Sequence, residues 1–551
     1  MKKLLKIKVL LSMMILGIAS IPAQEQTKPI FKKGEAQIVD AFNTPDKWLR
    51  HDLFVETTFD TDGDGKLDRM HVSVTRPYQT ENEGLKLPVI YESSPYYAGV
   101  AANVDGVFWN VRHELGEEPE ARVHPEVIRV SKRPIISNSQ IKTWVPRGYI
   151  VVHSSSPGTG LSQGAPTVGG INESLAPKAV IDWLNGRAKA YTEPYGNDEV
   201  KAYWTTGKVG MTGTSYNGTL ALAAATTGVD GLEVIIPIAP NTSYYHYYRS
   251  NGLVRSPGGY LGEDIDVLYD YIHSGDESKR AYNNAKIRDN IMKRGMDRIT
   301  GNYNDFWASR DYLNAMDAMK AAMLMSHGFN DWNVMPEHSY RIYKKAKEMG
   351  LETSIYYHQS GHGGPPPLSM MNKWFTHYLH HVDNGINKDV NKAWIVREDT
   401  NVQAPTPYKD YPNPEAKPVT FYLTAGLPKA GNLTINKPEK QGKETLVDNY
   451  SFDGKTLAKA EVTKHRLLYV TPELTKDLHI SGVPKISIRL TCNKPAANLS
   501  VWLVSLPWKE NSGTKITDNI ITRGWADPQN YKSISEGEAL VPGEFYEMTF
   551  E

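Results

Sequence analysis

The chain has 551 residues, of which 40% are hydrophobic, and its 62 Lys and Arg balance 62 Asp and Glu. This zero formal net charge gives no general attraction to nucleic acid or to an anionic membrane surface, so functions that depend on a strongly basic or acidic chain are excluded. The length leaves room for a large buried core and for about three to four domains of roughly 150 residues each.

The N-terminus has the pattern of a secretory signal peptide. Residues 1–6 carry three lysines, residues 9–21 are mainly apolar, and the small residue Ala23 follows. The apolar stretch is too short to span a membrane stably, so we expect residues 1–23 to be cleaved off and the protein to be exported, either periplasmic or secreted. A retained anchor is the alternative. The single cysteine, Cys492, allows no internal disulfide and lies far from the cleavage site, which excludes a lipoprotein anchor.

Two alternating apolar and polar runs, at 54–59 and 69–74, predict a β-hairpin. Their connection, residues 60–68, repeats the first nine positions of an EF-hand calcium loop. Position twelve is His71 instead of the bidentate glutamate, and strands flank the loop where an EF-hand has helices. We therefore predict a tight turn rich in Asp and Gly, with calcium binding as the alternative.

Residues 87–91 and 149–153 are apolar runs that each end in a polar or glycine-rich loop, as buried parallel strands do. Residues 178–184 predict a helix. With the strands and helices that follow, they form a strand–helix alternation typical of an α/β domain. We assign residues 24–240 and 317–392 to this domain.

The next motif is a serine at a sharp turn. Residues 208–212 predict a strand and residues 219–225 a helix, and Gly-Thr-Ser-Tyr-Asn-Gly at 213–218 lies between them. A strained strand-to-helix turn exposes the hydroxyl of Ser215 and directs the following backbone N–H groups at a developing oxyanion. The second glycine comes one place late for the usual G-x-S-x-G spacing, because position 217 is Asn. An ordinary Gly/Ser turn is the alternative.

Residues 241–316 interrupt the alternation and are rich in Tyr, Asn, Asp and Arg. Helices are expected at 265–273 and 278–294. An insertion after a core strand commonly forms a cap over the pocket of such a domain, so we predict a helical cap that shapes a substrate site.

Two further segments supply an acid and a base. An apolar strand from about 321 runs into a loop that carries Asp331, and a strand at 353–357 runs into a glycine-rich loop that carries His362. The order Ser, Asp, His is that of the α/β-hydrolase triad. The alternatives are a helix-capping aspartate, a solvated loop histidine, and His358 in place of His362 as the base.

From residue 393 to 551 the pattern changes to short alternating runs between Pro, Gly and Asn turns, which predicts an antiparallel β-sandwich of jelly-roll type. The last residues, 546–550, themselves form a predicted strand, so we expect the sandwich to be incomplete.

The motifs at 213–218, 327–334 (His-Gly-Phe-Asn-Asp-Trp-Asn-Val) and 358–366 (His-Gln-Ser-Gly-His-Gly-Gly-Pro-Pro) resemble those of the Xaa-Pro dipeptidyl-peptidase family, S15-type serine peptidases related to cocaine-esterase-like hydrolases. The resemblance covers about residues 45–551. The cap segment 243–264 is more similar to the peptidases than to the esterases.

This resemblance implies an exported serine exopeptidase that releases Xaa-Pro dipeptides through an acyl-enzyme. Ser215 matches the nucleophile, Asp331 the orienting acid and His362 the general base. Substrates would be peptides with a free N-terminus and proline at the second position. The resemblance implies no cofactor, no metal, no nucleic-acid partner and no membrane after signal cleavage, and leaves a homodimer possible.

The resemblance also implies roles around the triad. The oxyanion hole would combine the backbone N–H of Tyr216 with the hydroxyl of Tyr96, and Tyr97 replaces Tyr96 if the loop register differs. Glu263 matches the carboxylate that holds the substrate amine. Two substrate-binding tyrosines complete the set: Tyr244, where better-known members carry tryptophan, and Tyr247.

Two rival functions remain at this point. The first is an α-amino-acid ester hydrolase, acylase or cocaine-esterase-like hydrolase on the same scaffold, with the same triad but no preference for proline. The second is a non-enzymatic carbohydrate-binding protein whose C-terminal sandwich is the functional part, against which the Ser, Asp and His set argues.

Overall fold

The computed structural model describes most of the chain after residue 26. The described residues are 27–97, 100–101, 105–112, 117, 120–128, 138–397, 400–508 and 519–551. The predicted signal peptide at 1–23 lies outside these ranges. Among the described residues, the helices are too short or too polar to cross a membrane.

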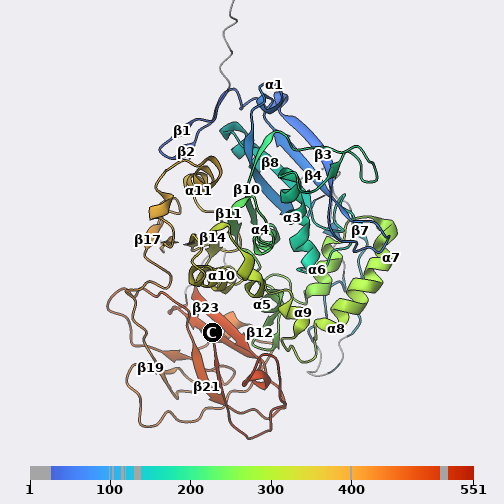
Figure 1. The fold of residues 1–551 in the computed structure, drawn as a ribbon. Helices are drawn as coiled ribbons and strands as arrows, with labels where there is room; N and C mark the ends of the chain where they lie inside the picture. The colour runs from blue at the N-terminus through green and yellow to red at the C-terminus, as the bar shows by residue number, and fades with distance from the viewer. Residues whose placement is uncertain are drawn as a thin grey trace, which may run out of the picture.

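One 11-stranded mixed sheet forms the body of the molecule (Figure 1). The strand order is β17-β16-β15-β14-β11-β10-β5-β8-β4-β3-β9. The bounds in chain order are β3 Leu49–Glu56, β4 Arg69–Arg76, β5 Leu87–Ser94, β8 Ile150–Ser155, β9 Ala190–Tyr191, β10 Thr205–Thr214, β11 Leu232–Ile238, β14 Ala322–Gly328, β15 Thr353–His358, β16 Ala393–Ile395 and β17 Thr406–Tyr408. Neighbours from β8 to β16 pair in parallel, and the pairs at either end are antiparallel.

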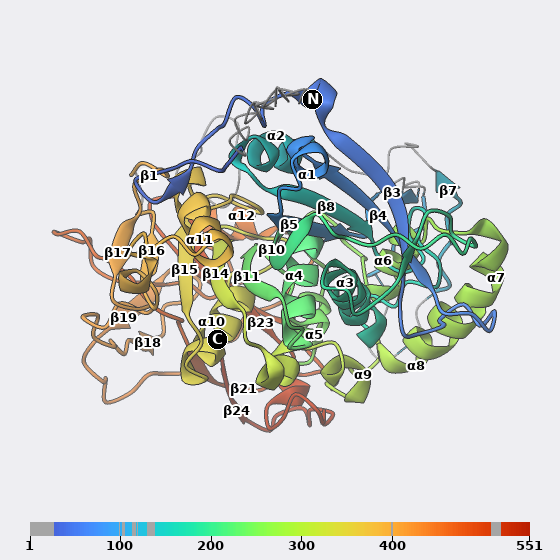
Figure 2. The ribbon, with the colours of Figure 1, turned by 45° about the horizontal axis from the view of Figure 1, so that its top comes forward.

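Helices cover both faces of this sheet. One face carries α3 (Ile171–Leu184), α4 (Tyr216–Thr226) and α10 (Glu337–Glu348), and the other carries α2 (Ser139–Trp144) and α11 (Leu368–His380). Alternate residues of one strand enter the two cores: in β5, Val89 and Tyr91 pack on the α4 side and Ile90 on the α11 side. Burial on both faces explains why these strands are continuous apolar runs in the sequence. Figure 2 shows α3 and α4 side by side in front of the strands.

The predicted hairpin is confirmed as the antiparallel pair β3–β4. The sheet also continues past residue 392, because β16 and β17 extend it to Tyr408. These two strands come from the segment that the sequence assigned to the C-terminal sandwich. Each strand is only a few residues long and is followed by a polar turn, as the strands of a sandwich are. For this reason the sequence pattern alone assigned them to the C-terminal sandwich.

The segment between β11 and β14 is mainly helical, as predicted for a cap. It contains short helices and one small hairpin: α5 Tyr244–Tyr248, β12 Arg249–Ser250, β13 Leu253–Val254, α6 Ile265–Ile272, α7 Arg280–Asn283, α8 Lys293–Gly295 and α9 Asp305–Ala308. Between α7 and α8, residues Asn284–Met292 form a π-helix. This wider helix, with i→i+5 hydrogen bonds, lies within the single helix expected at 278–294.

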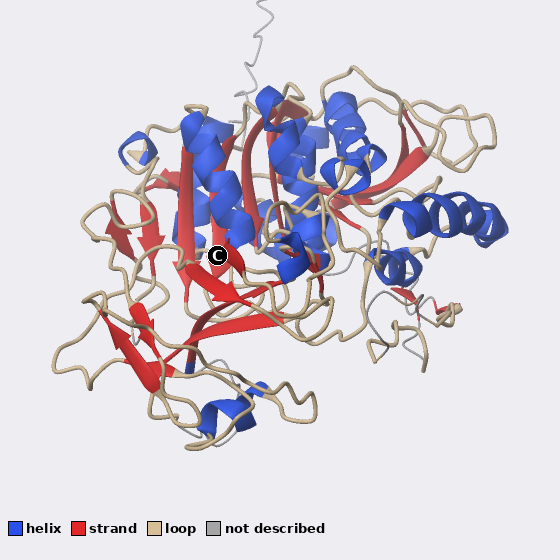
Figure 3. Cartoon of the chain, turned by 90° about the horizontal axis from the view of Figure 1, so that it is seen from below, coloured by secondary structure: helices blue, strands red, loops and turns tan. Residues whose placement is uncertain are grey.

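The C-terminal part is built from three small sheets, seen at the lower left in Figure 3. They are β18 (Tyr422–Thr424) with β19 (Gly431–Thr434) and β20 (Tyr469–Val470), β21 (Ile486–Leu490) with β24 (Tyr546–Phe550), and β22 (Leu499–Val504) with β23 (Ile520–Ala526). All these pairs are antiparallel except β19–β20, which is parallel. Among its described residues, Ala526, Met548 and Phe550 form one small buried apolar cluster.

The cap touches this C-terminal part directly. Asn251 of the β12–β13 turn accepts from the amide of Asp527 at 3.0 Å, and its side-chain amide donates to Trp525 O at 2.9 Å. Farther along the cap, the amide of Tyr303 donates to Ile534 O at 2.8 Å. Two separate parts of the cap are therefore hydrogen-bonded to the sandwich.

Candidate active site

The three candidate triad residues follow strands that end at the same edge of the sheet. Thr214 pairs with Ile238, Ile238 with Ser326, and Ser326 with Tyr356, so β10, β11, β14 and β15 are aligned in one row. Ligands of open parallel sheets bind beyond the carboxyl ends of the strands. The loops that carry Ser215, Asp331 and His362 all leave the sheet at this edge.

Ser215 occupies a strained turn between β10 and α4. Its backbone has φ 62° and ψ −126°, a region that non-glycine residues rarely adopt. Its amide donates to Ile238 O at 2.8 Å, which holds the turn to the neighbouring strand. A Cβ on Gly213 would lie 2.5 Å from that of Asn217, and a Cβ on Gly218 would lie 2.8 Å from Gly213 O. Both positions therefore require glycine. The second glycine comes one place later than in the usual G-x-S-x-G spacing but has the same steric role.

Asn217 stands where the usual motif has a glycine, and it links the Ser215 turn, here called the serine elbow, to strand β5. Its side-chain amide donates to Glu92 Oε1 at 2.8 Å. Burial raises the pKa of Glu92, and the hydrogen bond from Asn217 opposes this shift. The asparagine thus has a structural partner that the sequence motif does not reveal.

Asp331 lies in the loop after β14 with an exposed fraction of only 1%. Its Oδ1 accepts the amides of Asn333 and Val334, both at 2.9 Å. Its Oδ2 accepts from His362 Nδ1 at 2.7 Å and lies 3.3 Å from His327 Nε2. Burial raises the pKa of this carboxyl, but the hydrogen bonds from His327 and His362 outweigh burial and leave the pKa well below its usual value.

His362 therefore uses Nδ1 for the carboxylate, which leaves Nε2 as the proton acceptor of the neutral ring. Its loop reaches the serine elbow: a Cβ on Gly363 would meet only the methyl group of Thr214, at 3.7 Å. Histidine and serine loops are therefore neighbours in space although they are about 150 residues apart in the chain.

His358 has a different place. Its Nε2 lies 2.9 Å from Gly363 O and its Nδ1 accepts the amide of Ser360 at 3.1 Å, so both ring nitrogens bind the backbone of the loop that carries His362. The ring is 3% exposed, and burial lowers its pKa. His358 shapes the histidine loop and has no ring nitrogen left for a substrate.

His327 was missed by the sequence reasoning. It is fully buried in β14, its Nε2 lies 2.9 Å from Val334 O, and its Nδ1 lies 2.6 Å from Ser339 Oγ. A carbonyl can only accept, so Nε2 carries the proton and directs it toward Val334 O and Asp331. The position of this histidine four residues before Asp331 was the available signal.

Three of the four predicted tyrosines pack together beside Ser215, and the fourth, Tyr247, binds the loop that carries Asp331. The rings of Tyr96 and Tyr216 are 6.1 Å apart and those of Tyr216 and Tyr244 6.0 Å apart, both edge to face. The hydroxyl of Tyr247 donates to Asn333 Oδ1 at 3.0 Å. Tyr97 faces away from this group and packs on His153 with the ring centroids 6.0 Å apart. The structure thus brings Tyr96, and not Tyr97, to the elbow.

The backbone N–H of Tyr216 begins α4, where the first amides of a helix have no intrahelical acceptor. Burial raises the pKa of Tyr96, and the nearby Glu263 carboxylate adds to the shift. Tyr96 therefore keeps its proton and can donate a hydrogen bond.

Glu263 lies in the cap, 8% exposed, with Oε1 accepting from the hydroxyl of Tyr248 at 2.8 Å. Burial raises its pKa to about 7, and the charge of Asp264 contributes to the increase. The ionised form of such a buried carboxylate is stabilised strongly when a positive charge binds beside it.

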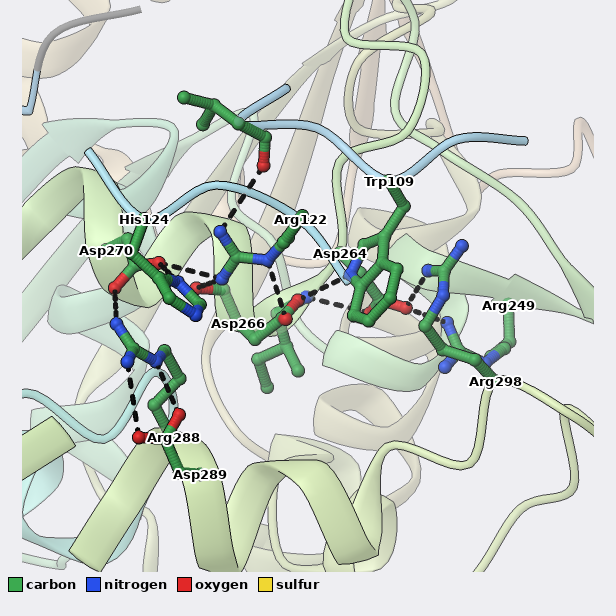
Figure 4. Close-up of polar contacts among 12 residues, drawn as sticks. Trp109, Arg122, His124, Arg249, Asp264, Asp266, Asp270, Arg288, Asp289 and Arg298 are labelled. Carbon is green, nitrogen blue, oxygen red and sulfur yellow. Dashed lines mark hydrogen bonds and ion pairs between the residues drawn. The ribbon is translucent and has the colours of Figure 1, made fainter. Parts of the chain in front are cut away.

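Charged pairs hold the cap segment that carries Glu263 (Figure 4). Asp264 is fully buried, and its Oδ2 binds Arg249 at 3.0 Å and also pairs with Arg298. Within α6 itself, Arg122 binds Asp266 at 2.9 Å and Asp270, one turn later, at 2.8 Å. Arg249 and Arg298 therefore fix Asp264 at the start of α6, and Asp264 in turn positions its neighbour Glu263.

A second buried carboxylate, that of Glu173, was also missed by the sequence reasoning, and it holds two of the tyrosines in place. Glu173 of α3 is fully buried and accepts the hydroxyl of Tyr216 at 2.6 Å and the amides of Val168 and Gly169 at 2.9 and 3.0 Å. A Cβ on Gly169 would lie 2.3 Å from the ring of Tyr244. Glu173 thus fixes the Tyr216 ring and the loop that supports Tyr244.

Within the described ranges, one group of acidic residues has metal-ligand spacing: Asp60, Asp62 and Asp68, with their nearest oxygens within 4.8 Å of one another. Asp60 accepts the amide of Gly63, and Asp68 accepts the amide and hydroxyl of Thr61, as in a tight turn. The ammonium of Lys279 lies 3.6 Å from Asp62.

The sequence matches two family models. Residues 62–364 match X-Pro dipeptidyl-peptidase (S15 family), and residues 384–551 match the X-Pro dipeptidyl-peptidase C-terminal non-catalytic domain. The chain belongs to the X-Pro dipeptidyl-peptidase (S15) family. A relative from Rhodopirellula baltica that carries the family's name is 62% identical over 98% of this chain and 87% of its own length. A relative from Bacillus anthracis is 39% identical over 95% of this chain and 81% of its own length.

Solved structures agree on the fold of this S15-family chain. An aminopeptidase from the marine sediment archaeon Thaumarchaeota archaeon matches with TM-score 0.56 and 17% identity, over 92% of this chain and 85% of its own. An α-amino acid ester hydrolase matches with TM-score 0.54 and 16% identity, over 96% and 89%. These likenesses confirm an α/β-hydrolase domain, and the family makes the chain a serine-type dipeptidyl peptidase. The rival of a non-enzymatic carbohydrate-binding protein is thereby wrong.

Proposed function

We propose that this S15-family chain releases Xaa-Pro dipeptides from the free N-terminus of peptides, through an acyl-enzyme on Ser215. The observation that carries the proposal is the 2.7 Å hydrogen bond from His362 Nδ1 to the buried Asp331, in a loop that adjoins the serine elbow. The names of the relatives support the same activity.

In the proposed reaction, Ser215 Oγ attacks the carbonyl carbon of the proline residue while His362 Nε2 takes the hydroxyl proton. Asp331 holds the imidazole tautomer and stabilises the imidazolium. The amide of Tyr216 and the hydroxyl of Tyr96 bind the oxyanion. His362 then donates its proton to the departing amine. In the second half of the reaction, water attacks the ester while His362 takes a proton from it, and His362 returns this proton to Ser215 as the dipeptide leaves.

The substrate ends are assigned from the surrounding side chains. The substrate ammonium group binds Glu263, and this charge stabilises the carboxylate that burial otherwise disfavours. The proline ring packs among the rings of Tyr216, Tyr244 and Tyr247. Aromatic faces offer a large rigid apolar surface for such a ring.

A fluorophosphonate probe and a panel of chromogenic dipeptides test this proposal. The probe should label wild-type protein and not Ser215→Ala. Gly-Pro-p-nitroanilide should be cleaved much faster than the Gly-Ala and N-blocked Gly-Pro compounds. Equal rates on all three would instead support an ester or acyl hydrolase, and absence of labelling would overturn the serine mechanism.

We also propose that the protein is exported, because residues 1–23 have the pattern of a signal peptide. N-terminal sequencing of the protein from its native host should begin at residue 24. A start at Met1 in the mature protein would contradict export by this route. A homodimer stays a prediction.

A further inference from the structure

Two arginines near the candidate triad have nitrogens without partners. Among the described residues, no acceptor lies within hydrogen-bonding distance of Nε and Nη2 of Arg255 or of Nε of Arg523, and all three atoms are shielded from solvent. An unpaired buried cationic group costs several kcal/mol, so native structures rarely keep one without a purpose. Both residues are only partly buried as a whole, so part of each side chain remains accessible.

These arginines come from different parts of the chain and share a contact with one aromatic ring, that of Trp525. Arg255 belongs to the cap, and its amide donates to Tyr248 O at 3.1 Å. Arg523 belongs to β23 of the sandwich. Their guanidinium groups lie 5.0 Å and 5.3 Å from the centre of the Trp525 ring, and Arg523 also lies over Trp332. We call these four residues the arginine cluster.

The arginine cluster adjoins the catalytic loop. Trp332 directly follows Asp331 in the chain, and the charge of Asp331 acts on Arg523. Burial, together with repulsion from Arg255, lowers the pKa of Arg523 to about 8, and this repulsion agrees with the shared contact of the two guanidinium groups with Trp525. Burial raises the pKa of Tyr247. The charge of Glu263 raises this pKa further, whereas the charge of Arg255 lowers it, so Arg255 acts electrostatically on a predicted substrate-binding residue.

Within the described part of the chain, the two carboxyl groups whose charges act on the cluster, Asp331 and Glu337, form no ion pair with it. Asp331 already accepts hydrogen bonds from His362, Asn333 and Val334. Glu337 attracts Arg255 and Arg341, but burial raises its pKa and so favours its neutral form. The positive charge of the cluster is therefore available to a ligand.

We propose that Arg255 and Arg523 bind a carboxylate on the leaving-group side of the peptide substrate, which in a tripeptide is its C-terminal carboxylate. The proposal rests on the proposed function. His362 must protonate the departing amine, so the leaving residue lies beside the loops that carry His362 and Asp331, and Trp332, which follows Asp331 in the chain, connects this region to Arg523. Guanidinium groups bind carboxylates through paired hydrogen bonds. The site thus offers an acid, Glu263, for one end of a short peptide and two arginines for the other.

The test compares peptides that differ only in a carboxylate. In the full chain, kcat/KM for Gly-Pro-Gly should exceed that for Gly-Pro-Gly-amide by about 10- to 100-fold, the range expected for charge-assisted hydrogen bonds. A second pair, Gly-Pro-Asp-amide and Gly-Pro-Asn-amide, shows whether an acidic side chain is bound as well. Preference for the acid in either pair supports a carboxylate site and identifies its source.

Variants assign the site to the two arginines. In Arg255→Gln and Arg523→Gln the acid-to-amide ratio should fall toward 1, with each rate normalised to Gly-Pro-p-nitroanilide in the same variant. Arg523→Lys keeps the charge and should retain part of the ratio. Arg489→Gln, an exposed arginine of β21, is the matched control and should keep the whole ratio.

A ratio near 1 in both peptide pairs with the unaltered protein would overturn the proposal, and this measurement needs no variant to fold. A ratio that persists in both glutamine variants would overturn it as well. If Gly-Pro-p-nitroanilide itself is not cleaved, the proposed function fails, and the two failures are thereby distinguished.

Discussion

Replacement of Glu263 by glutamine should stabilise the empty protein at alkaline pH. The folded carboxyl has a pKa of about 7 against a reference value of 4.5, so the folded state binds more protons than the unfolded state between these values. Wild-type stability therefore falls as pH rises through this window, whereas the glutamine variant carries no proton to lose. A pKa difference of about 2.5 corresponds to roughly 3–4 kcal/mol, since each pKa unit is worth about 1.4 kcal/mol.

The assay is thermal unfolding of wild type and Glu263→Gln from pH 4.5 to pH 8.5. The variant should gain relative stability with increasing pH and level off above about pH 8. With Gly-Pro-p-nitroanilide, the same variant should lose about 10- to 100-fold in kcat/KM, because the ammonium group loses a charged partner. Exposed Glu277→Gln in the same cap is the control and should change neither property.

A stability difference that does not vary with pH, or a variant that becomes less stable than wild type as pH rises, would refute this reasoning. Loss of activity on N-blocked ester substrates equal to the loss on free-amine substrates would remove Glu263 from the amine site.

Three further outcomes are expected. Ser215→Gly should abolish turnover and raise the free energy of unfolding by about 1 kcal/mol, because glycine accepts φ 62° without strain; a lower melting temperature would contradict this. His362→Gln should lower kcat by about 10⁴-fold or more at unchanged melting temperature, whereas His358→Gln should lower the melting temperature and keep measurable turnover; the reverse pattern would exchange their roles. EDTA should leave the melting temperature unchanged, because Lys279 already supplies a cation to the 60–68 loop, and calcium-dependent stabilisation would disprove that.

The sequence alone predicted the parts of the fold whose patterns are local. A buried parallel strand is a continuous apolar run, and the Ser215 turn needs small residues on both sides, so β10 and α4 were predictable, while the catalytic roles of Ser215, Asp331 and His362 stay a prediction. The hairpin β3–β4 followed from simple alternation.

What the sequence did not reveal depends on long-range contacts. Glu92 and Glu173 lie in ordinary strand and helix positions, and only the folded chain shows that they bind Asn217 and Tyr216. Strands β16 and β17 could not be assigned to the large sheet, because a strand of three residues carries no signal of its partner. The parallel pair β19–β20 and the π-helix were missed for the same reason, since hydrogen-bond registers leave no periodicity in short segments.

The hydrogen bonds that join the cap to the C-terminal part have a consequence for the size of substrates under the proposed function. The cap cannot move away from this part without breaking the contacts of Asn251 with β23 and of Tyr303 with Ile534. We therefore expect the cap to keep its position beside the candidate site during turnover, so that the proposed exopeptidase acts on flexible peptide ends and not on the folded surface of a protein.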